Sequence, residues 1–454
     1  PFILPANTLS AGGYDVANSL RFNTGSSDYL NRSPSSAGNL TTWTLSMWVK
    51  RSILGGEKPL FSCRPDGNNE TFVGFGSSDT LVYKQKTSGS TSGQIVTNKV
   101  FRDTSAWYHL VFVYDINNGT AGDRGRLYVN GVRETSFSAQ TNFSQNSSWN
   151  STTSNAIGIS QSAYFAGYMS EVCFIDGQAL AADSFGEFDE DSGIWKPINV
   201  SGLTFGTNGF YLETKQSGTS QNSSGLGADT SGNDNHFAVN NLTAVDQSTD
   251  TCTNNFAVGN PLVQNDLPAF SNGNLTYTSG SNNYKTGLST IGVSSGKWFM
   301  EVLFVSGSTA IIGVVDEADF GSLNGNTAGA GFTTNSVGYY KDGTKWIADS
   351  ESSYGASYAA DDTIGIALDL DSGTKTVTFY KDGASQGAIN LPTTGTGTFF
   401  FAPGAFNGVL SANYGSPPYA ISSGNTDPNG YGNFEFTVPS NHYALNTKNL
   451  AEFG

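Results

Sequence analysis

Short apolar runs that end at Asn-Gly or Asp-Gly turns are the feature that most limits how this chain can fold. Residues 107–115 are apolar at nearly every position, as in a central strand or one covered on both faces. In the next run, Asn130-Gly131 supplies the two residues of positive φ that a tight type I′ hairpin requires. Asp342-Gly343 and Asp382-Gly383 mark hairpins in the same way. Consecutive hairpins of this kind predict an all-β chain of antiparallel strands.

The strand pattern occurs twice along 454 residues, which exceeds the roughly 250–300 residues at which a single core stops growing. The second occurrence alternates more cleanly, with Trp298, Met300 and Val302 on one face of a strand. We therefore predict two antiparallel jelly-roll β-sandwiches joined by a polar linker. The predicted parts are an N-terminal arm at residues 1–17, a first sandwich at 18–195, a connector and Ser/Asn/Gly-rich linker at 196–273, a second sandwich at 274–415 and a C-terminal connector at 416–454.

The predicted linker consists mostly of Ser, Asn, Asp, Thr and Gly, which is too polar to form a core of its own. We expect it to lie along the surface, attached by a few apolar side chains. These are Phe237, Val239, Leu242, Phe256 and Leu262. Residues 210–215 and 443–448 have similar sequences, so each sandwich is predicted to have a C-terminal connector of its own.

The charge balance excludes one class of partner. The chain has 38 acidic and 22 basic residues, for a formal charge of −16, whereas nucleic-acid binding depends on Lys and Arg. No run of 18 apolar residues occurs, so no membrane insertion is expected. Residues 1–5 do not resemble a signal peptide, which predicts synthesis in a host cytoplasm. Cys63, Cys173 and Cys252 are predicted to be buried free thiols, without a disulfide or a zinc site.

Several segments resemble known families. The first sandwich is similar to the laminin-G-like and pentraxin-like branch of the concanavalin-A-type jelly rolls, through residues 107–111, 127–131 and 167–180. The second resembles SPRY domains, through residues 296–302, 362–369 and 379–383. The resemblance implies that both sandwiches have a concanavalin-A-like fold.

The whole arrangement resembles cyanophage-type tail-fibre or virion appendage proteins of marine bacteriophages. The residues that resemble them are 18–22, 229–235, 253–257 and 443–450. This resemblance implies a structural protein displayed on the outside of a virion.

Lectin-fold sandwiches include glycoside hydrolases, which need two carboxyl groups at set positions on one strand. The nearest candidate is the run from Glu187 to Ser192, which lacks the apolar alternation of a strand. Ser192 also stands where a laminarinase-type motif needs its last Glu. His109 is interpreted as a packed residue without a catalytic partner. We therefore predict no enzymatic activity.

Laminin-G-like and pentraxin-like domains often hold Ca²⁺, and this resemblance makes acidic loop residues weak candidates for a calcium site. They have no EF-hand spacing, and solvated turns explain them equally well. They are Asp115, Asp123, Asp176, Asp316, Glu317 and Asp319. No other cofactor is expected.

Aromatic residues in polar, turn-rich stretches could stack on a sugar ring. Trp149, Trp346, Tyr354 and Tyr358 are the candidates, although they could instead cap a sandwich or fill a contact between subunits. Trp43, Trp107 and Trp298 are assigned to the core.

The leading hypothesis is a non-enzymatic virion protein, a tail fibre or surface appendage that contacts the host surface, mediates assembly, or both. Its expected partners are other virion proteins, further copies of this chain and a cell-surface glycan. The first alternative is a secreted carbohydrate-binding adhesin, and a polysaccharide-degrading glycoside hydrolase is a third class.

Overall fold

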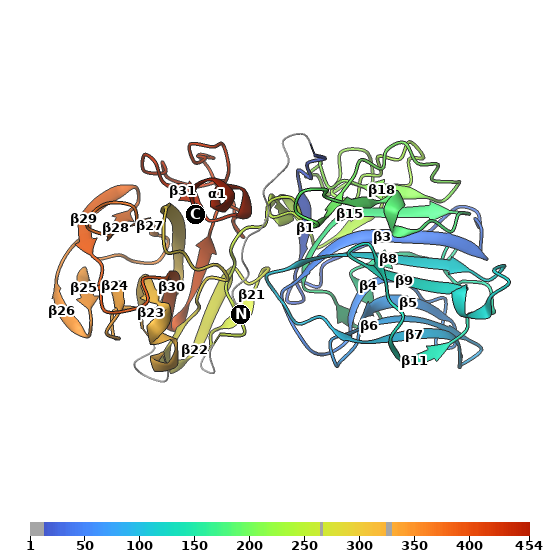
Figure 1. Ribbon diagram of the computed structural model, residues 1–454, viewed down its shortest axis with the longest axis horizontal. Coiled ribbons are helices and arrows are strands. Elements are labelled where there is room, and N and C mark those ends of the chain that lie inside the picture. Colours follow the sequence, from blue (N-terminus) through green and yellow to red (C-terminus); the bar gives the residue numbers. More distant parts are fainter. Residues whose placement is uncertain (1–12, 264–266, 324–328) are drawn as a thin grey trace. The chain divides into compact units, whose positions relative to one another are not determined.

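The computed structural model describes residues 13–263, 267–323 and 329–454, apart from the side chains of 281–283. Residues 1–12 of the predicted N-terminal arm lie outside the described residues. The described chain forms two compact units, which meet in sequence between Thr253 and Asn254. We call them the N-terminal unit and the C-terminal unit (Figure 1).

The N-terminal unit is a β-sandwich of two sheets in which every strand pair is antiparallel. In order, the first sheet contains β10 (Val132–Arg133), β9 (Gly125–Val129), β8 (Trp107–Asp115), β3 (Thr42–Arg51), β15 (Gly167–Asp176), β1 (Ser19–Phe22) and β20 (Gln247–Ser248), with β18 (Phe210–Leu212) also paired to β15. The second sheet contains β11 (Phe137–Thr141), β7 (Ser90–Val100), β6 (Thr80–Thr87), β5 (Glu70–Phe75), β4 (Lys58–Cys63), β12 (Asn155–Ile157), β2 (Tyr29–Arg32) and β19 (Ala238–Asn240).

An aromatic core lies between these two sheets. Trp43 and Tyr114 stack with their ring centroids 5.1 Å apart, and Trp149 packs 4.6 Å from Trp43. Trp43 is fully buried, as predicted, whereas Trp107 at the start of β8 is only half-buried. The predicted type I′ hairpin is confirmed, because Asn130 and Gly131 have φ values of 47° and 79°.

The described chain also contains two pairs of short strands and four 3₁₀ turns. The strands are β13 (Ile159–Ser160) with β14 (Ala163–Tyr164), and β16 (Gly186–Phe188) with β17 (Trp195–Pro197). The turns are η1 (Ala121–Asp123), η2 (Ala182–Ser184), η3 (Ala244–Asp246) and η4 (Glu317–Ser322).

The structure corrects the predicted connector and linker at residues 196–273. Its strands β18, β19 and β20 pair with β15, β2 and β1, and Leu226, Phe237 and Leu242 are buried in the aromatic core. The N-terminal unit thus extends to Thr253. The polar composition of the segment suggested a linker. A few spaced apolar residues are nevertheless enough to bury such a segment when its strands pair with the sheets of a neighbouring sandwich. Beyond Thr253, Phe256 is buried in the C-terminal unit, while Leu262 is 56 % exposed.

The C-terminal unit is a second sandwich, in which two long strands contribute to most of the pairing. They are β23 (Lys297–Asp316) and β30 (Phe399–Asn413), which pair antiparallel along most of their lengths. The other strands are β21 (Ala269–Ser271), β22 (Thr276–Thr286), β24 (Ser336–Tyr340), β25 (Thr344–Ile347), β26 (Ser350–Ser353), β27 (Thr363–Asp369), β28 (Thr376–Lys381), β29 (Ala384–Asn390) and β31 (Tyr443–Ala444).

Besides β30, the two halves of β23 pair with different strands, so this one strand contributes to both layers of the sandwich. Its first half pairs with β27 and its second half with β24. Trp298 and Met300 from the first half share a core with Ile312 and Val314 from the second. The hairpin at Asp382-Gly383 has the predicted positive φ values, whereas at Asp342-Gly343 only the glycine does, so a three-residue loop joins β24 to β25.

The predicted C-terminal connector at residues 416–454 is an integral part of the C-terminal unit. Strand β31 pairs in parallel with β23, and α1 (Thr447–Phe453) follows directly. Phe434, Val438 and Ala444 pack with Phe256 and Phe299 in a buried cluster. In the described part of the chain, no helix has the length and apolar character needed to cross a membrane.

The burial of Phe237 gives a direct test of whether residues 196–253 belong to the N-terminal unit. Phe237 is 1 % exposed and packs 4.7 Å from Phe210. We expect Phe237→Ala to lower the free energy of unfolding by about 3–5 kcal/mol in urea denaturation. A surface linker would instead give the small change expected of Phe188→Ala, which removes a ring that is 50 % exposed.

Candidate binding surfaces

The outer face of the β8–β3–β15 sheet is covered by the chain that follows β15. Phe185, Trp195, Val200 and Phe205 pack there as one cluster against side chains of the sheet. The partners from the sheet include Trp48, Val111, Val113 and Ile175. This part of the sheet face is therefore filled by the protein itself.

His109 lies beneath this cover and is held in its neutral form. Trp195 Nε1 donates to His109 Nδ1 over 2.9 Å, so Nε2 carries the proton and faces Ser46 Oγ at 2.8 Å. Burial lowers the pKa of His109 to about 3. The interpretation of His109 as a packed residue agrees with these contacts.

The carboxylates between Glu187 and Asp191 lie in β16 and in the turn that joins it to β17. Lys196 Nζ is 3.4 Å from Glu187 Oε1 and 3.1 Å from Asp189 Oδ2. Hydrogen bonds from the Ser192 backbone, and then from Lys196, lower the pKa of Asp189 to about 2. Asp189 is thus ionised at neutral pH and has no proton to donate as a general acid.

The calcium candidates are dispersed, and four of them are already engaged within the protein. Asp176 accepts hydrogen bonds from the backbone N–H groups of Asn39 and Asn208. Asp123 forms an ion pair with Arg133, and Asp319 accepts a hydrogen bond from Asn335. Asp316 accepts hydrogen bonds from Ala318, Thr396 and Gly397. Within the described ranges, no three His, Cys, Asp or Glu side chains form a group that could hold a metal ion. Calcium binding stays an untested prediction.

The thiols of Cys63, Cys173 and Cys252 are free, as predicted. Cys63 and Cys173 are buried, and Cys252 is half-buried. Burial raises the pKa of Cys63 to about 12, which leaves its thiol protonated and unreactive.

Two of the four aromatic candidates are buried, which agrees with the alternative that these side chains cap a sandwich. Trp149 is 0 % exposed and packs on Trp43 and Phe61. Tyr358 is 3 % exposed and donates to the carbonyl oxygens of Ala310 and Tyr339. Both side chains follow polar loops in sequence, yet both fold back into a core. The polar neighbours of these residues in sequence do not indicate that their side chains are buried.

Trp346 and Tyr354 are half-buried and lie on opposite faces of the C-terminal unit's sheet. Tyr354 packs on the core residues Tyr339 and Phe379, and its hydroxyl donates to Gly387 O. Trp346 alternates with Ile347, which packs on that core, so Trp346 points outward. These two residues therefore do not form one site.

Trp346 is one end of a group of four half-buried rings that we call the aromatic row. Its members in order are Trp346, Phe332, Tyr284 and Phe406. Successive ring centroids are 4.8, 5.3 and 5.3 Å apart. The ring planes meet at 86°, 74° and 55°, so the row is a corrugated surface of edges and faces.

Polar groups border the aromatic row. Tyr284 donates to the hydroxyl of Tyr340 over 3.1 Å, and the exposed residues Asn407 and Asp349 follow closely after Phe406 and Trp346 in sequence. Apolar rings beside such groups can contact the C–H face of a sugar and bind its hydroxyls. Trp346 was predicted from the sequence, whereas Phe332, Tyr284 and Phe406 were not. The outward positions of β30 carried a signal for Phe406, because its neighbour Ala405 points into the core.

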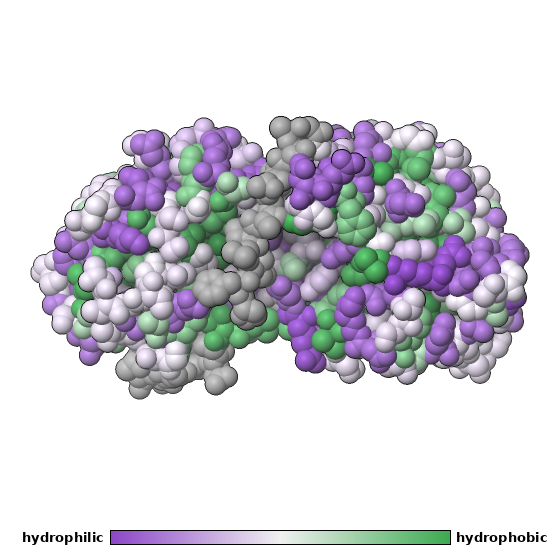
Figure 2. Space-filling view, in the orientation of Figure 1, coloured by the Kyte–Doolittle hydropathy of each residue, from purple (hydrophilic) through white to green (hydrophobic). Residues whose placement is uncertain are grey.

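Other exposed hydrophobic side chains are scattered. Figure 2 shows hydrophobic residues in separate patches among hydrophilic ones on the face that is drawn. Val100, Val132, Phe188, Leu262 and Val305 are the large hydrophobic residues with substantial exposure in the described chain. Single exposures of this kind are ordinary for a folded protein.

Glu171 on β15 is a buried carboxyl group that the sequence did not single out. It is 7 % exposed, has a φ of 52° and lies in an irregularity of the β15–β3 pairing. Tyr14 donates to its Oε2 over 3.1 Å, and Tyr211 donates to the same oxygen. Burial raises the pKa of Glu171 to about 7. This pKa would suit a general acid, but the carboxyl group is buried and bound by two tyrosine hydroxyls.

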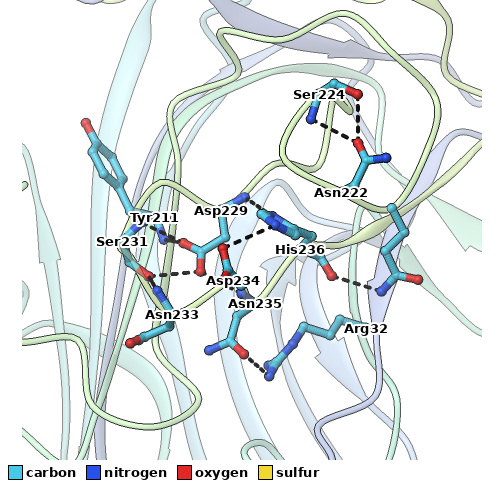
Figure 3. A network of polar contacts seen from close by, with 11 residues as sticks. Arg32, Tyr211, Asn222, Ser224, Asp229, Ser231, Asn233, Asp234, Asn235 and His236 are labelled. Carbon is cyan, nitrogen blue, oxygen red and sulfur yellow. Dashed lines mark hydrogen bonds and ion pairs between the residues drawn. The ribbon is translucent and has the colours of Figure 1, made fainter.

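A polar network fills the loop between β18 and β19 (Figure 3). Asp229 accepts hydrogen bonds from the backbone N–H groups of Tyr211, Ser231 and Asn235. His236 Nδ1 accepts from the Asp229 N–H over 3.0 Å, and Arg32 donates to Asn235 Oδ1. The network holds the loop together and ties it to β18 and β2.

Comparison with family models identifies both units. Residues 24–183 match the model of the concanavalin A-like lectin/glucanases superfamily in its laminin G form, and residues 297–416 match the model of the SPRY domain. The chain thus contains a laminin G-like domain followed by a SPRY domain, and the resemblance of each sandwich to its family is confirmed. No curated protein sequence matches the chain.

Solved structures give weaker matches. A human SPRY domain is 21 % identical, with a TM-score of 0.26, over 33 % of this chain and 94 % of its own. A heptameric pentraxin from Limulus polyphemus is 17 % identical, with a TM-score of 0.27, over 37 % and 80 %. Domains LG4-5 of the mouse laminin α1 chain are 9 % identical, with a TM-score of 0.29, over 88 % and 89 %. The fold assignment depends on the strand pairing and the family models.

The raised pKa of Glu171 predicts how stability changes with pH. Between its ordinary pKa of 4.5 and about 7, the folded protein keeps a proton that the unfolded chain has lost. The free energy of unfolding should therefore fall as pH rises through this window, by up to about 3 kcal/mol from this group. Urea denaturation of the wild type and of Glu171→Gln at pH 5, 6 and 7 measures this effect. The free energy of unfolding of the wild type should fall relative to that of Glu171→Gln as the pH rises from 5 to 7.

Glu301 in the C-terminal unit has a pKa that burial raises to about 7 as well, so the wild type alone cannot isolate Glu171. The matched control is Glu187→Gln, whose side chain is 58 % exposed. It should keep the pH dependence of the wild type. An identical pH dependence in Glu171→Gln would show that Glu171 ionises normally.

Proposed function

We propose that this chain is a non-enzymatic binding protein that contacts carbohydrate on a cell surface. The aromatic row of the C-terminal unit is the observation that carries the proposal. Four half-buried rings outside the core, bordered by hydroxyl, amide and carboxylate groups, have the chemistry of a sugar-binding surface. Laminin G-like and SPRY domains are binding-type domains, which is consistent with this role.

The carboxylates of Glu187, Asp189 and Glu171 give no support to the alternative of a glycoside hydrolase. Glu187 and Asp189 share the ion-pair partner Lys196, and Asp189 is ionised at neutral pH. Burial raises the pKa of Glu171 to about 7, but this group is buried and bound by two tyrosines. A hydrolase needs an acid and a second carboxylate that both reach the substrate.

We further propose that the protein is displayed on a bacteriophage virion as a tail fibre or surface appendage, as a homo-oligomer with other virion proteins. The resemblance of residues 229–235 and 443–450 to cyanophage-type appendages supports this part of the proposal. A secreted adhesin is the alternative, and it would use the same aromatic row.

Removal of the Trp346 ring tests the binding surface. We expect Trp346→Ala to weaken glycan-array binding at least about tenfold, because the loss of one aromatic contact of a binding surface costs about 1.4 kcal/mol or more. Tyr380→Ala is the matched control, since Tyr380 is a half-buried ring packed on a different cluster of the same unit. Circular dichroism and the unfolding midpoint should show that both variants fold.

Two outcomes would contradict this proposal. In the first, no glycan binds the wild type, or Trp346→Ala binds as well as Tyr380→Ala does. In the second, the wild type releases reducing sugars from a host polysaccharide and Glu187→Gln does not, which would identify a hydrolase.

The location is tested on particles. Antibodies raised against the purified chain should label the tail or outer surface of virions in electron micrographs of the phage that encodes it. Virions without label, together with free protein in the culture medium, would favour the secreted adhesin. Sequestration of the antibodies by purified chain serves as the control for specific labelling.

A further inference from the structure

A small cavity in the N-terminal unit lies where the segment that contains β18 and β19 packs on the sandwich. Four phenylalanine rings line it, together with the polar side chains of Arg32, Asn150, Asn155 and Asn208. The volume open to a small molecule is about 10 Å³. This is close to the space that one water molecule needs inside a protein.

Two side chains that line this cavity each carry a buried oxygen without a hydrogen-bond partner among the described residues. These are the side-chain oxygens of Asn150 and Asn155, which are 2 % and 6 % exposed. The orientation of the Asn150 amide is fixed, because its Nδ2 donates to Asn39 O over 3.0 Å and to Asp176 Oδ1. Buried acceptors of this kind are nearly always satisfied, by protein or by ordered water.

The charges around the cavity limit what can fill it. Arg32 lines the cavity and donates to Asn208 Oδ1 and Asn235 Oδ1, so its positive charge disfavours a cation. The two unpaired oxygens disfavour an anion. The occupant must be neutral, as small as water and able to donate two hydrogen bonds.

We propose that this cavity binds one internal water molecule, which donates hydrogen bonds to Asn150 Oδ1 and Asn155 Oδ1. The water links the loop at Asn150 and strand β12 beside the packed segment of residues 206–240. It is a structural site within the N-terminal unit, and it does not depend on the proposed carbohydrate binding.

A crystal structure of the full chain at a resolution that shows ordered water tests the proposal. We expect one water peak within hydrogen-bond distance of both asparagine oxygens. In solution, oxygen-17 relaxation dispersion counts long-lived internal waters. Asn155→Leu removes one acceptor and fills the space, so it should lose one such water relative to the wild type.

The matched control is Asn98→Leu, which makes the same change at an exposed position of β7 in the same sheet. It should keep the wild-type number of waters. Should Asn155→Leu fail to fold, Asn155→Asp keeps an acceptor of the same shape and should retain the water peak. An empty cavity, a peak larger than one water, or an unchanged count of internal waters in folded Asn155→Leu would overturn the proposal.

Discussion

The backbone hydrogen bonds of one long strand in each unit are the constraint on which the rest of that unit depends. Strand β15 pairs with β1, β3 and β18, and β23 pairs with β24, β27, β30 and β31. The residues of β15, and most residues in the two halves of β23, are buried, so a polar side chain among them must find partners within the protein. Glu171 on β15 binds Tyr14 and Tyr211, and Glu301 on β23 accepts from the backbone N–H groups of residues 435 and 436. Each buried carboxyl therefore fastens a segment that is distant in sequence onto the central strand.

The similar segments at residues 210–215 and 443–448 occupy comparable places in the two units. Their first residues form β18 in one unit and β31 in the other, and each short strand extends the pairing of the long strand. The second residue of each segment donates its N–H to an aspartate, Tyr211 to Asp229 over 2.8 Å and Ala444 to Asp427 over 2.9 Å. These segments are closing elements of the sandwiches, which is why treating them as connectors was wrong.

The sequence was informative wherever a local pattern decides the structure. Alternation identified the strands around Trp298, and the residues of positive φ identified the hairpins at Asn130 and Asp382. It failed where burial depends on contacts between distant segments. Composition described residues 216–253 as polar, but a few spaced side chains such as Phe237 bury the segment. The same limit applies to the candidate site. Trp149 and Trp346 have similar polar neighbours in sequence, but Trp149 is fully buried and Trp346 is half-buried.

The places where a ligand could bind follow from which sheet faces are covered. In the N-terminal unit, the chain after β15 folds back over the β8–β3–β15 sheet, and Trp195 is hydrogen-bonded to His109 beneath it. A ligand on this face would have to displace a hydrophobic cluster, at a cost that grows with the buried area. In the C-terminal unit, Leu288, Val315 and Ala402 on the outer face of the sheet are buried, whereas the rings of the aromatic row are only half-buried. Contact with the C–H face of a sugar would therefore bury apolar surface at the row without first removing part of the protein.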